Sequence, residues 1–305
     1  MSARELVVLG TASQVPTRRR AHHGAFLRWD AEGILFDPGE GTQRQLTLAG
    51  VAASSITRIC LTHLHGDHCL GLPGVVQRLA LDHVQHPVHL YFPAEGQEYV
   101  DRLLHACVSY RFPDLRLHPV SSDGAVDVAP AFTLHARALD HRIPTYGWRL
   151  MEPDGRRMRP DLLERRGIRG AAIGELQRRG VLGVAGRQVR LEEVSEPRPG
   201  QVFAFVMDTR PCDAAVELAR EADLLVCEST FLDHEAELAE SYSHLTAKQA
   251  ARIASRARAR RLVLTHFSQR YDDEASFAEE ARAVFPDVHA ARDLDRVPVP
   301  ARRCP

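Results

Sequence analysis

The sequence has little of several features that would place the chain in a known class. Lys248 is the only lysine, so arginine carries nearly all the positive charge, and the formal net charge is −1. A near-neutral chain has no bulk attraction for nucleic acid, so any RNA binding must depend on local patches. The apolar run at the N-terminus, Leu6–Leu9, is too short for a signal peptide core or a membrane span. We therefore expect a cytoplasmic protein with no membrane partner.

Cysteine pairs of the kind that bind zinc are also missing. The six cysteines are scattered, with no CxxC pair and no dense spacing. A disulfide framework or a cysteine zinc site would need such spacing, so we expect buried or free thiols. Histidine, by contrast, is abundant, with 16 in 305 residues, and it is the commonest side-chain ligand of transition metals. The composition therefore directs attention to histidine clusters.

Short apolar segments alternate with helical patterns along most of the chain. At 44% hydrophobic content, 305 residues can bury a large core. The strand candidates are Glu5–Gly10, Ala25–Trp29, Ile34–Asp37, Arg58–Thr62, Val88–Phe92, Phe132–Leu139, Val202–Met207, Leu224–Glu228 and Arg261–Thr265. The helix candidates are Leu72–His83, Gly96–Cys107, Cys212–Glu221 and Thr246–Ala259, the last opened by a capping box of Thr246 and Gln249. This alternation predicts an α/β fold with helices packed on sheets.

Residues Pro153–Gly200 differ from the rest of the chain. They are rich in arginine and glycine, show few strand signals, and are helical only in pieces such as Pro160–Arg166. We predict an inserted, flexible arm in an otherwise single domain of residues 1–305. Between Arg156 and Arg190, ten arginines face three acids, a local charge of +7. This is either a solvated basic surface or a phosphate-contacting one, because guanidinium groups bind phosphate bidentately. Candidate RNA contacts in it are Arg156, Arg157, Arg165 and Arg166.

The densest group of possible metal ligands is His63-Leu64-His65-Gly66-Asp67-His68, directly after the strand candidate Arg58–Thr62. A loop that leaves a strand end can turn alternate side chains toward a common point. Imidazole and carboxylate together suit zinc, with manganese or iron as substitutes. The spacing allows His63 and His65 to hold one metal, and Asp67 and His68 a second.

Three further polar residues directly follow apolar runs. His141 follows Phe132–Leu139, Asp208 follows Val202–Met207, and His266 follows Leu262–Thr265. Each alone is compatible with an ordinary strand-end residue. As a set, they would complete a dinuclear site.

Short motifs along the chain form a recognisable series. Leu9-Gly10-Thr11 is followed by Asp37-Pro38-Gly39-Glu40-Gly41-Thr42-Gln43, and the histidine-rich loop by Gly71-Leu72-Pro73. Later come His141 with Gly147-Trp148-Arg149, Asp208-Thr209-Arg210, Cys227-Glu228-Ser229-Thr230 and Ser243-His244-Leu245-Thr246. The series resembles the tRNase Z (ribonuclease Z) family of the metallo-β-lactamase superfamily over nearly the whole chain. Met207 and Cys227 stand where that family has glycine and histidine.

The resemblance implies a metallo-β-lactamase fold, a four-layer αβ/βα sandwich carrying an inserted basic arm. It implies two Zn²⁺ per chain, with Mn²⁺ as a substitute. One zinc would be held by His63, His65 and His141, and the other by Asp67, His68 and His266, with Asp208 bridging.

The implied reaction is endonucleolytic removal of the 3′ trailer of precursor tRNA after the discriminator nucleotide, leaving a 3′ hydroxyl. Two zinc ions about 3.5–4 Å apart would activate water and stabilise charge on the phosphoryl oxygens. We expect Asp67 to act as ligand and proton acceptor. His244, supported by Glu228, is expected to contact the phosphate or act as general acid.

Substrate contacts are also implied by the resemblance. The basic loop Pro16–His23, with Arg18, Arg19 and Arg20, stands where the family has a loop that guides the tRNA 3′ end. The family also forms homodimers in which the arm of one subunit reaches tRNA at the other, although Arg169–Gly174 lacks the Gly-Pro pair common in bacterial arms.

Other functions are compatible with a dinuclear site. A metallo-hydrolase of small molecules, such as a phosphodiesterase or thioesterase, is the alternative enzyme class, since fold and ligands do not name the substrate. A non-catalytic RNA-binding protein is the third reading, against which the intact ligand set argues.

Overall fold

The structure is a computed structural model that describes residues 4–109 and 111–301. The chain divides into two compact units, one formed by Met1–Leu150 and Val202–Pro300, the other chiefly by Met151–Gln201. The second unit coincides closely with the predicted insertion.

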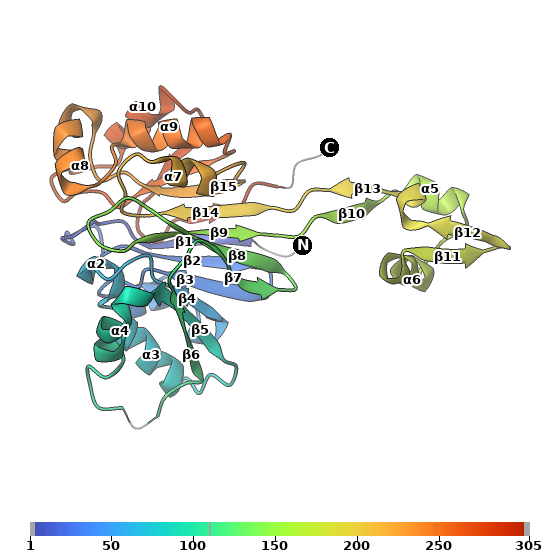
Figure 1. Ribbon diagram of the computed structural model, residues 1–305, viewed down its shortest axis with the longest axis horizontal. Helices are drawn as coiled ribbons and strands as arrows, with labels where there is room; N and C mark the ends of the chain where they lie inside the picture. The colour runs from blue at the N-terminus through green and yellow to red at the C-terminus, as the bar shows by residue number, and fades with distance from the viewer. Residues whose placement is uncertain (1–3, 110, 302–305) are drawn as a thin grey trace. The chain divides into compact units, whose positions relative to one another are not determined.

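Two seven-stranded sheets form the first unit (Figure 1). In spatial order, the first sheet contains β18 (Arg296–Pro298), β1 (Arg4–Gly10), β2 (Gly24–Trp29), β3 (Glu32–Phe36), β4 (Arg58–Cys60), β5 (Val88–Pro93) and β6 (Leu115–Val120). The second contains β17 (Val288–Ala290), β16 (Leu262–Thr265), β15 (Leu224–Glu228), β14 (Val202–Val206), β9 (Tyr146–Met151), β8 (Phe132–Ala138) and β7 (Gly124–Ala129). Strands β3 to β6 pair in parallel, as do β14 to β17.

The two sheets face each other across a shared apolar core. Phe36 of β3 stacks on Phe205 of β14 with ring centroids 4.5 Å apart, and both tryptophans, Trp29 and Trp148, are fully buried in the same cluster. Burying an apolar side chain of this size contributes about 1.5–3 kcal/mol, so this layer is a main source of stability.

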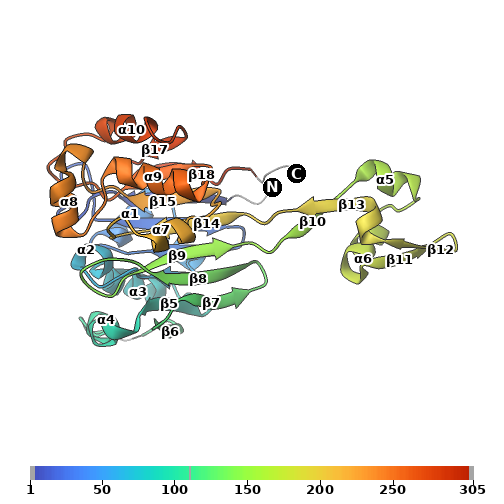
Figure 2. The same ribbon diagram turned by 45° about the horizontal axis from the view of Figure 1, so that its top comes forward.

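Helices cover the outer face of each sheet (Figure 2). The first sheet is covered mainly by α1 (Thr42–Leu48), α3 (Leu72–Leu81) and α4 (Gln97–Leu104), with α2 (Gly66–Cys69) and the short turns η1 (Ala53–Ser55) and η2 (Ala94–Gly96) in the connections. The second is covered by α7 (Asp213–Leu218), α9 (Ala247–Ala257) and α10 (Ala275–Arg282), with η4 (Asp233–Glu235) and α8 (Ala236–Tyr242) before α9. The four-layer sandwich is therefore confirmed, as is the capping box that opens α9.

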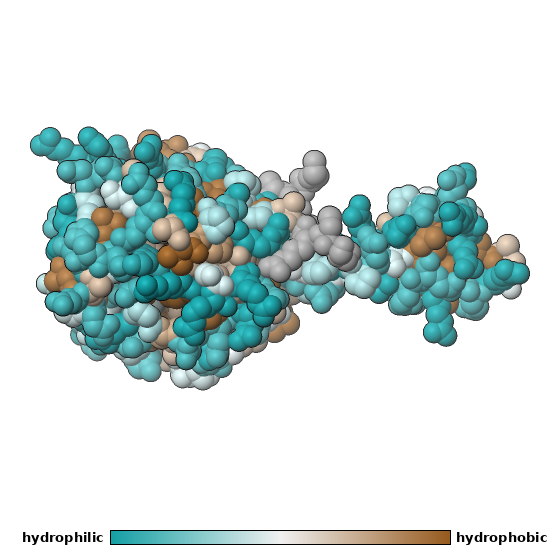
Figure 3. All heavy atoms as spheres, turned by 90° about the horizontal axis from the view of Figure 1, so that it is seen from above, coloured by the Kyte–Doolittle hydropathy of each residue, from teal (hydrophilic) through white to brown (hydrophobic). Residues whose placement is uncertain are grey.

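The second unit has more strands than the sequence indicated. It holds two small antiparallel sheets, β10 (Gly155–Met158) with β13 (Ser195–Arg198) and β11 (Val181–Val184) with β12 (Arg187–Arg190). Helices α5 (Pro160–Arg165) and α6 (Ala171–Arg179) and the turn η3 (Leu191–Val194) lie between them. A small core that includes Leu163, Leu176 and Val189 packs these elements together. The strands escaped prediction because each is only four residues long, and two of them, β10 and β12, are half arginine. In Figure 3 the visible surface of each unit is largely hydrophilic, and smaller apolar areas are scattered among the hydrophilic ones.

Among the described residues, no helix is long and apolar enough to cross a membrane.

Candidate metal centre

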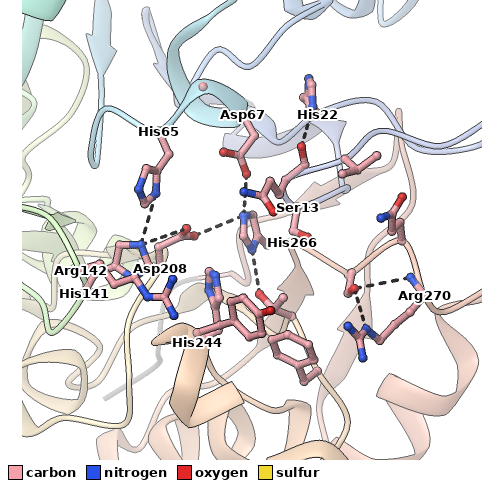
Figure 4. Close-up of a pocket in the computed structure, with 18 of the residues that line it drawn as sticks. Ser13, His22, His65, Asp67, His141, Arg142, Asp208, His244, His266 and Arg270 are labelled. Atoms are coloured by element: carbon pink, nitrogen blue, oxygen red, sulfur yellow. Dashed lines mark hydrogen bonds and ion pairs between the residues drawn. The ribbon is translucent and has the colours of Figure 1, made fainter. Parts of the chain in front are cut away.

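The candidate ligands lie in loops that leave the carboxyl ends of strands. The loop after β4 and the short helix α2 carry His63, His65, Asp67 and His68. The remaining three follow strands of the second sheet: His141 comes after β8, Asp208 after β14 and His266 after β16. Because parallel strands end at the same edge of a sheet, the chain brings side chains that are up to 203 positions apart (63 to 266) into one cluster. Figure 4 shows five of them: His65, Asp67, His141, Asp208 and His266.

One group of donor atoms comprises His63, His65, His141 and Asp208. His63 Nε2 lies 2.9 Å from His65 Nδ1 and 3.3 Å from Asp208 Oδ2. His141 Nε2 lies 3.4 Å from His65 Nδ1 and 3.8 Å from the same Asp208 oxygen.

A second group comprises Asp67, His68 and His266. The Nε2 atoms of His68 and His266 are 3.1 Å apart, and each lies 3.4 Å from Asp67 Oδ2. Asp208 Oδ1 lies 3.3 Å from His266 Nε2, so Asp208 offers one oxygen to each group. The seven residues of the predicted ligand set are therefore together, with Asp208 between the two groups.

The spacing of the donor atoms fits tetrahedral metal coordination. Zinc–nitrogen bonds of about 2.0–2.1 Å place neighbouring tetrahedral ligands about 3.3 Å apart, close to the separations in both groups. Asp208 Oδ1 is buried without a hydrogen bond. Unprotonated nitrogen lone pairs that face each other at such distances repel unless a cation lies between them. The residues therefore fit divalent metal ions.

In three of the histidine ligands, a hydrogen bond made by Nδ1 fixes the ring so that Nε2 faces the site. His68 Nδ1 lies 2.9 Å from Asp37 Oδ2, and His141 Nδ1 lies 3.0 Å from the Ser243 carbonyl. His63 Nδ1 lies 3.0 Å from the Thr62 hydroxyl, which itself donates to Asp37 at 2.7 Å. Each acceptor favours a proton on Nδ1 and leaves the Nε2 lone pair for a metal.

His266 is oriented in the same way. Its Nδ1 lies 2.9 Å from the Thr230 hydroxyl, which donates to Glu228 at 2.7 Å. Sequence reasoning gave no role to Asp37, Thr62 or Thr230. The position of Asp37 directly after a strand, like that of Asp208, was the signal that could have found it.

Backbone conformation at the site is strained. Asp37, Asp208, Ser243 and His266 all have positive φ, between 45° and 64°. Left-handed non-glycine residues cost about 1–3 kcal/mol each, so the surrounding contacts must hold them there. Asp208 and His266 each come just after a strand, and this turn of the backbone aims their side chains at the pocket.

Glu228, at the end of β15, joins three loops of the site. Its Oε1 accepts from Thr209 N at 2.7 Å and His244 Nδ1 at 3.0 Å, and its Oε2 accepts from Thr230 Oγ1 at 2.7 Å and Leu245 N at 3.1 Å. The side chain is fully buried. This one carboxylate therefore positions His244 directly and supports the loops that carry Asp208 and His266.

Burial and neighbouring charges lower the pKa of some histidines of the site and raise the pKa of His244. Burial, together with His68, lowers the pKa of His63 to about 3, and burial also lowers the pKa of His65 and His141, so these rings are neutral and able to bind metal. Burial also opposes protonation of His244, but Glu228 and Asp208 outweigh it and raise its pKa to about 9. His244 is therefore a proton donor at neutral pH.

A pocket of about 440 Å³ opens over the donor atoms. Asp67, His244 and His266 line it, together with Arg142 and Arg270 (Figure 4). Gly39 packs against the backbone that carries Asp67, since a Cβ there would meet the Asp67 carbonyl at 2.2 Å. The Asp-Pro-Gly sequence thus serves close packing beneath Asp67.

Comparison with known proteins identifies the family of the chain. The metallo-beta-lactamase superfamily matches residues 23–139, and the beta-lactamase superfamily domain matches residues 190–267. Ribonuclease Z of Nocardia farcinica is 61% identical over 305 residues, which cover 99% of this chain and 100% of that protein. The chain belongs to the ribonuclease Z family. Ribonuclease Z of Streptomyces coelicolor, at 57% identity, and that of Chlamydia pneumoniae, at 47%, also match over at least 98% of both chains.

Solved structures agree with this family and fold. Human tRNase Z, short form, superposes with a TM-score of 0.70 at 26% identity, covering 97% of this chain and 100% of that one. The metallo-beta-lactamase fold protein YhfI from Bacillus subtilis, at 18% identity and a TM-score of 0.71, shares the fold. The family resemblance read from the motifs is confirmed.

The basic loop near the N-terminus separates into two kinds of arginine. Arg18 and Arg19 are exposed and remain candidates for RNA contact. Arg20 is only 4% exposed, and its guanidinium donates to the Glu274 carboxylate and the Tyr271 carbonyl, both at 2.9 Å. The expectation that Arg20 contacts substrate is therefore corrected: it anchors the loop, because its charge is already paired with Glu274 and is shielded from solvent.

The charge of +7 between Arg156 and Arg190 is partly neutralised by acidic residues that lie just outside that segment but within the second unit. Residues 151–201 contain eleven arginines and eight acids, a net charge of +3. Arg157 and Arg166 pair with Glu196 and Glu193, and Arg156 donates to Ser195. In the described part of this unit, the exposed arginines without an ion pair are Arg165, Arg178, Arg187 and Arg190.

Cys227, which stands where the family has histidine, is fully buried in the core beneath the second sheet, and burial raises its pKa well above the usual range. Its thiol packs against apolar neighbours and contributes no ligand.

Proposed function

We propose that the protein is a zinc phosphodiesterase that removes the 3′ trailer of precursor tRNA after the discriminator nucleotide, leaving a 3′ hydroxyl. As a member of the ribonuclease Z family, it is an endoribonuclease that hydrolyses RNA phosphodiester bonds. The observation that carries the proposal is the pair of donor groups that share Asp208 at the base of a pocket containing His244.

Divalent metal use follows from the fold and the cluster of histidines and aspartates. We assign His63, His65 and His141 to one Zn²⁺, Asp67, His68 and His266 to the other, and Asp208 to both. When bound, the two ions supply Lewis acidity that activates water and neutralises charge on the phosphoryl oxygens.

The chain's own residues supply proton transfer. His244 holds one proton on Nδ1 against Glu228 and presents the other, on Nε2, to the pocket, where it protonates the departing 3′ oxygen. Asp67 is held ionised: burial opposes this, but His68 and His266 outweigh it and lower its pKa. Asp67 is therefore a carboxylate that can orient the attacking water, and we assign it the role of accepting the proton of that water.

RNA binding is assigned to Arg18 and Arg19 and to the second unit. Because arginine–phosphate contacts release condensed counterions, tRNA affinity should fall steeply with salt. Within the second unit we propose Arg156, Arg157, Arg165 and Arg166 as contacts, and add the exposed Arg178 and Arg187. We also propose a homodimer, to be tested by sedimentation equilibrium; the cytoplasmic location stays a prediction.

Cleavage of a 3′-extended precursor tRNA tests the reaction. Zinc-loaded protein is compared with His65→Ala, Asp67→Ala and, as a control, His234→Ala, a histidine that is exposed outside the pocket. We expect a cut directly after the discriminator, abolished in the first two variants and unchanged in the third. Absence of cleavage in zinc-loaded wild type would favour a small-molecule hydrolase.

Deletion of the second unit tests its role in RNA binding. Glu152 N donates to the Gln201 carbonyl at 2.9 Å, so a two-residue Asn-Gly turn can replace residues 153–200. We expect the shortened protein to hydrolyse a small phosphodiester at the wild-type rate but to lose precursor tRNA cleavage. Full tRNA cleavage without these residues would refute the assignment.

A further inference from the structure

One wall of the pocket is aromatic and has no part in the chemistry assigned so far. Phe231, in the loop after β15, and Tyr242, the last residue of α8, both line the pocket, with ring centroids 6.3 Å apart and planes tilted by 27°. Phe231 is buried, whereas Tyr242 is 48% exposed. A large aromatic ring left open in a pocket that histidines and arginines also line offers a surface for a flat ligand.

Two arginines flank these rings. The Arg142 guanidinium carbon lies 5.1 Å from the centre of the Tyr242 ring, and that of Arg270 lies 5.3 Å from the centre of the Phe231 ring. Arg142 also donates to the Ser241 carbonyl, and Arg270 pairs with Glu235 at 2.7 Å. Aromatic rings next to guanidinium groups are the combination by which proteins hold unpaired nucleotides, stacking the base and contacting the phosphate.

The position of His244 indicates which nucleotide this wall would meet. Its ring lies 6.2 Å from that of Phe231. In the proposed reaction His244 protonates the 3′ oxygen of the nucleotide upstream of the scissile phosphate. The ribose of that nucleotide must therefore lie beside His244, and the aromatic wall of Phe231 and Tyr242 lies within reach of the base attached to it.

We propose that Tyr242, backed by Phe231 and flanked by Arg142, is the stacking platform for the base of the nucleotide immediately upstream of the cleaved bond. This inference rests on the proposed function and names the positioning residue for its substrate. Stacking tolerates any base, because every base has a π-face, so the platform fixes the cleavage position without restricting which base occupies it.

Fluorescence measures the stacking without cleavage. A tRNA that ends at the discriminator and carries 2-aminopurine there is titrated with zinc-loaded protein. We expect quenching with wild type and with Tyr242→Phe, and its loss with Tyr242→Ala. Tyr99→Ala, which removes a tyrosine that is 55% exposed on α4 outside the pocket, is the matched control and should quench as wild type does. Equal quenching by Tyr242→Ala would overturn the proposal.

Cleavage of a precursor with an abasic discriminator separates this inference from the proposed function. Removal of the base should lower kcat/KM about 5- to 150-fold in wild type, the usual range for one stacked base, and have little effect in Tyr242→Ala. An abasic penalty that persists in Tyr242→Ala refutes the platform while leaving the endonuclease intact. A wild-type protein that neither binds tRNA nor cuts its precursor refutes both.

Discussion

Replacement of Glu228 by glutamine removes a charge from the centre of the site with almost no change in volume. The carboxylate accepts four hydrogen bonds, from Thr209 N, His244 Nδ1, Thr230 Oγ1 and Leu245 N. An amide has one acceptor oxygen, so in either orientation its NH₂ group faces two of these donors.

The expected loss follows from those two bonds. A hydrogen bond to a buried charged group contributes about 1.5–3 kcal/mol, so Glu228→Gln should lower the free energy of unfolding by about 3–6 kcal/mol. Since domains are typically stable by about 5–15 kcal/mol, the change is large. His244 also loses its orienting charge, and we expect kcat for precursor tRNA to fall about 10²- to 10⁴-fold.

Urea unfolding of the zinc-loaded proteins measures the change in the free energy of unfolding, provided that its dependence on urea concentration (the m-value) is the same in both proteins. Glu237→Gln, at an exposed position in the first turn of α8, is the matched control and should stay within about 0.5 kcal/mol of wild type. A loss below about 1 kcal/mol in Glu228→Gln would show that the loops do not depend on this carboxylate.

Three further predictions concern the same region. Removal of metal with a chelator should lower the urea midpoint, because a metal that binds only the assembled ligands of the folded protein stabilises it, and added Zn²⁺ should restore it; an unchanged midpoint would contradict the metal assignment. In metal-free protein, the pKa of His244 is raised from 6.5 to about 9. The resulting stability is complete below pH 6.5 and lost as pH rises through 9, so the advantage of wild type over Glu228→Gln should shrink across that range; a constant difference would be the contrary result. Thr246→Ala removes the N-cap of α9, whose hydroxyl accepts from Gln249 N at 3.2 Å, and should cost about 1 kcal/mol in urea unfolding, more than Thr47→Ala on the exposed face of α1.

Local sequence was sufficient for most of the core elements. The apolar runs before His63, Asp208 and His266 are strands because they alternate with helical patterns that must cover them, and their ends are visible where polar residues begin. The fold and the family followed from these runs and from the motifs at their ends. Where helices were drawn too long, as at Leu72–His83, the structure ends α3 at Leu81, and His83 has a positive φ of 52°.

Contacts between residues far apart in the sequence could not be predicted from local patterns. The salt bridge of the buried Arg20 joins it to Glu274, 254 positions along the chain. The strands of the second unit form because Leu163, Leu176 and Val189 pack into a common core. Charge counted along the chain overstated the basic surface for the same reason, since Glu193 and Glu196 fold back onto Arg166 and Arg157.

The sequence by itself determined the ligand types, the strand ends that carry them and the family, because side-chain chemistry and periodicity are local properties of the chain. Only the tertiary structure decided that Asp37 orients His68, that Glu228 joins three loops, and that the half-exposed Tyr242 lines the same pocket as His244. Those relations depend on which strands become neighbours, and the packing of the two sheets sets that order.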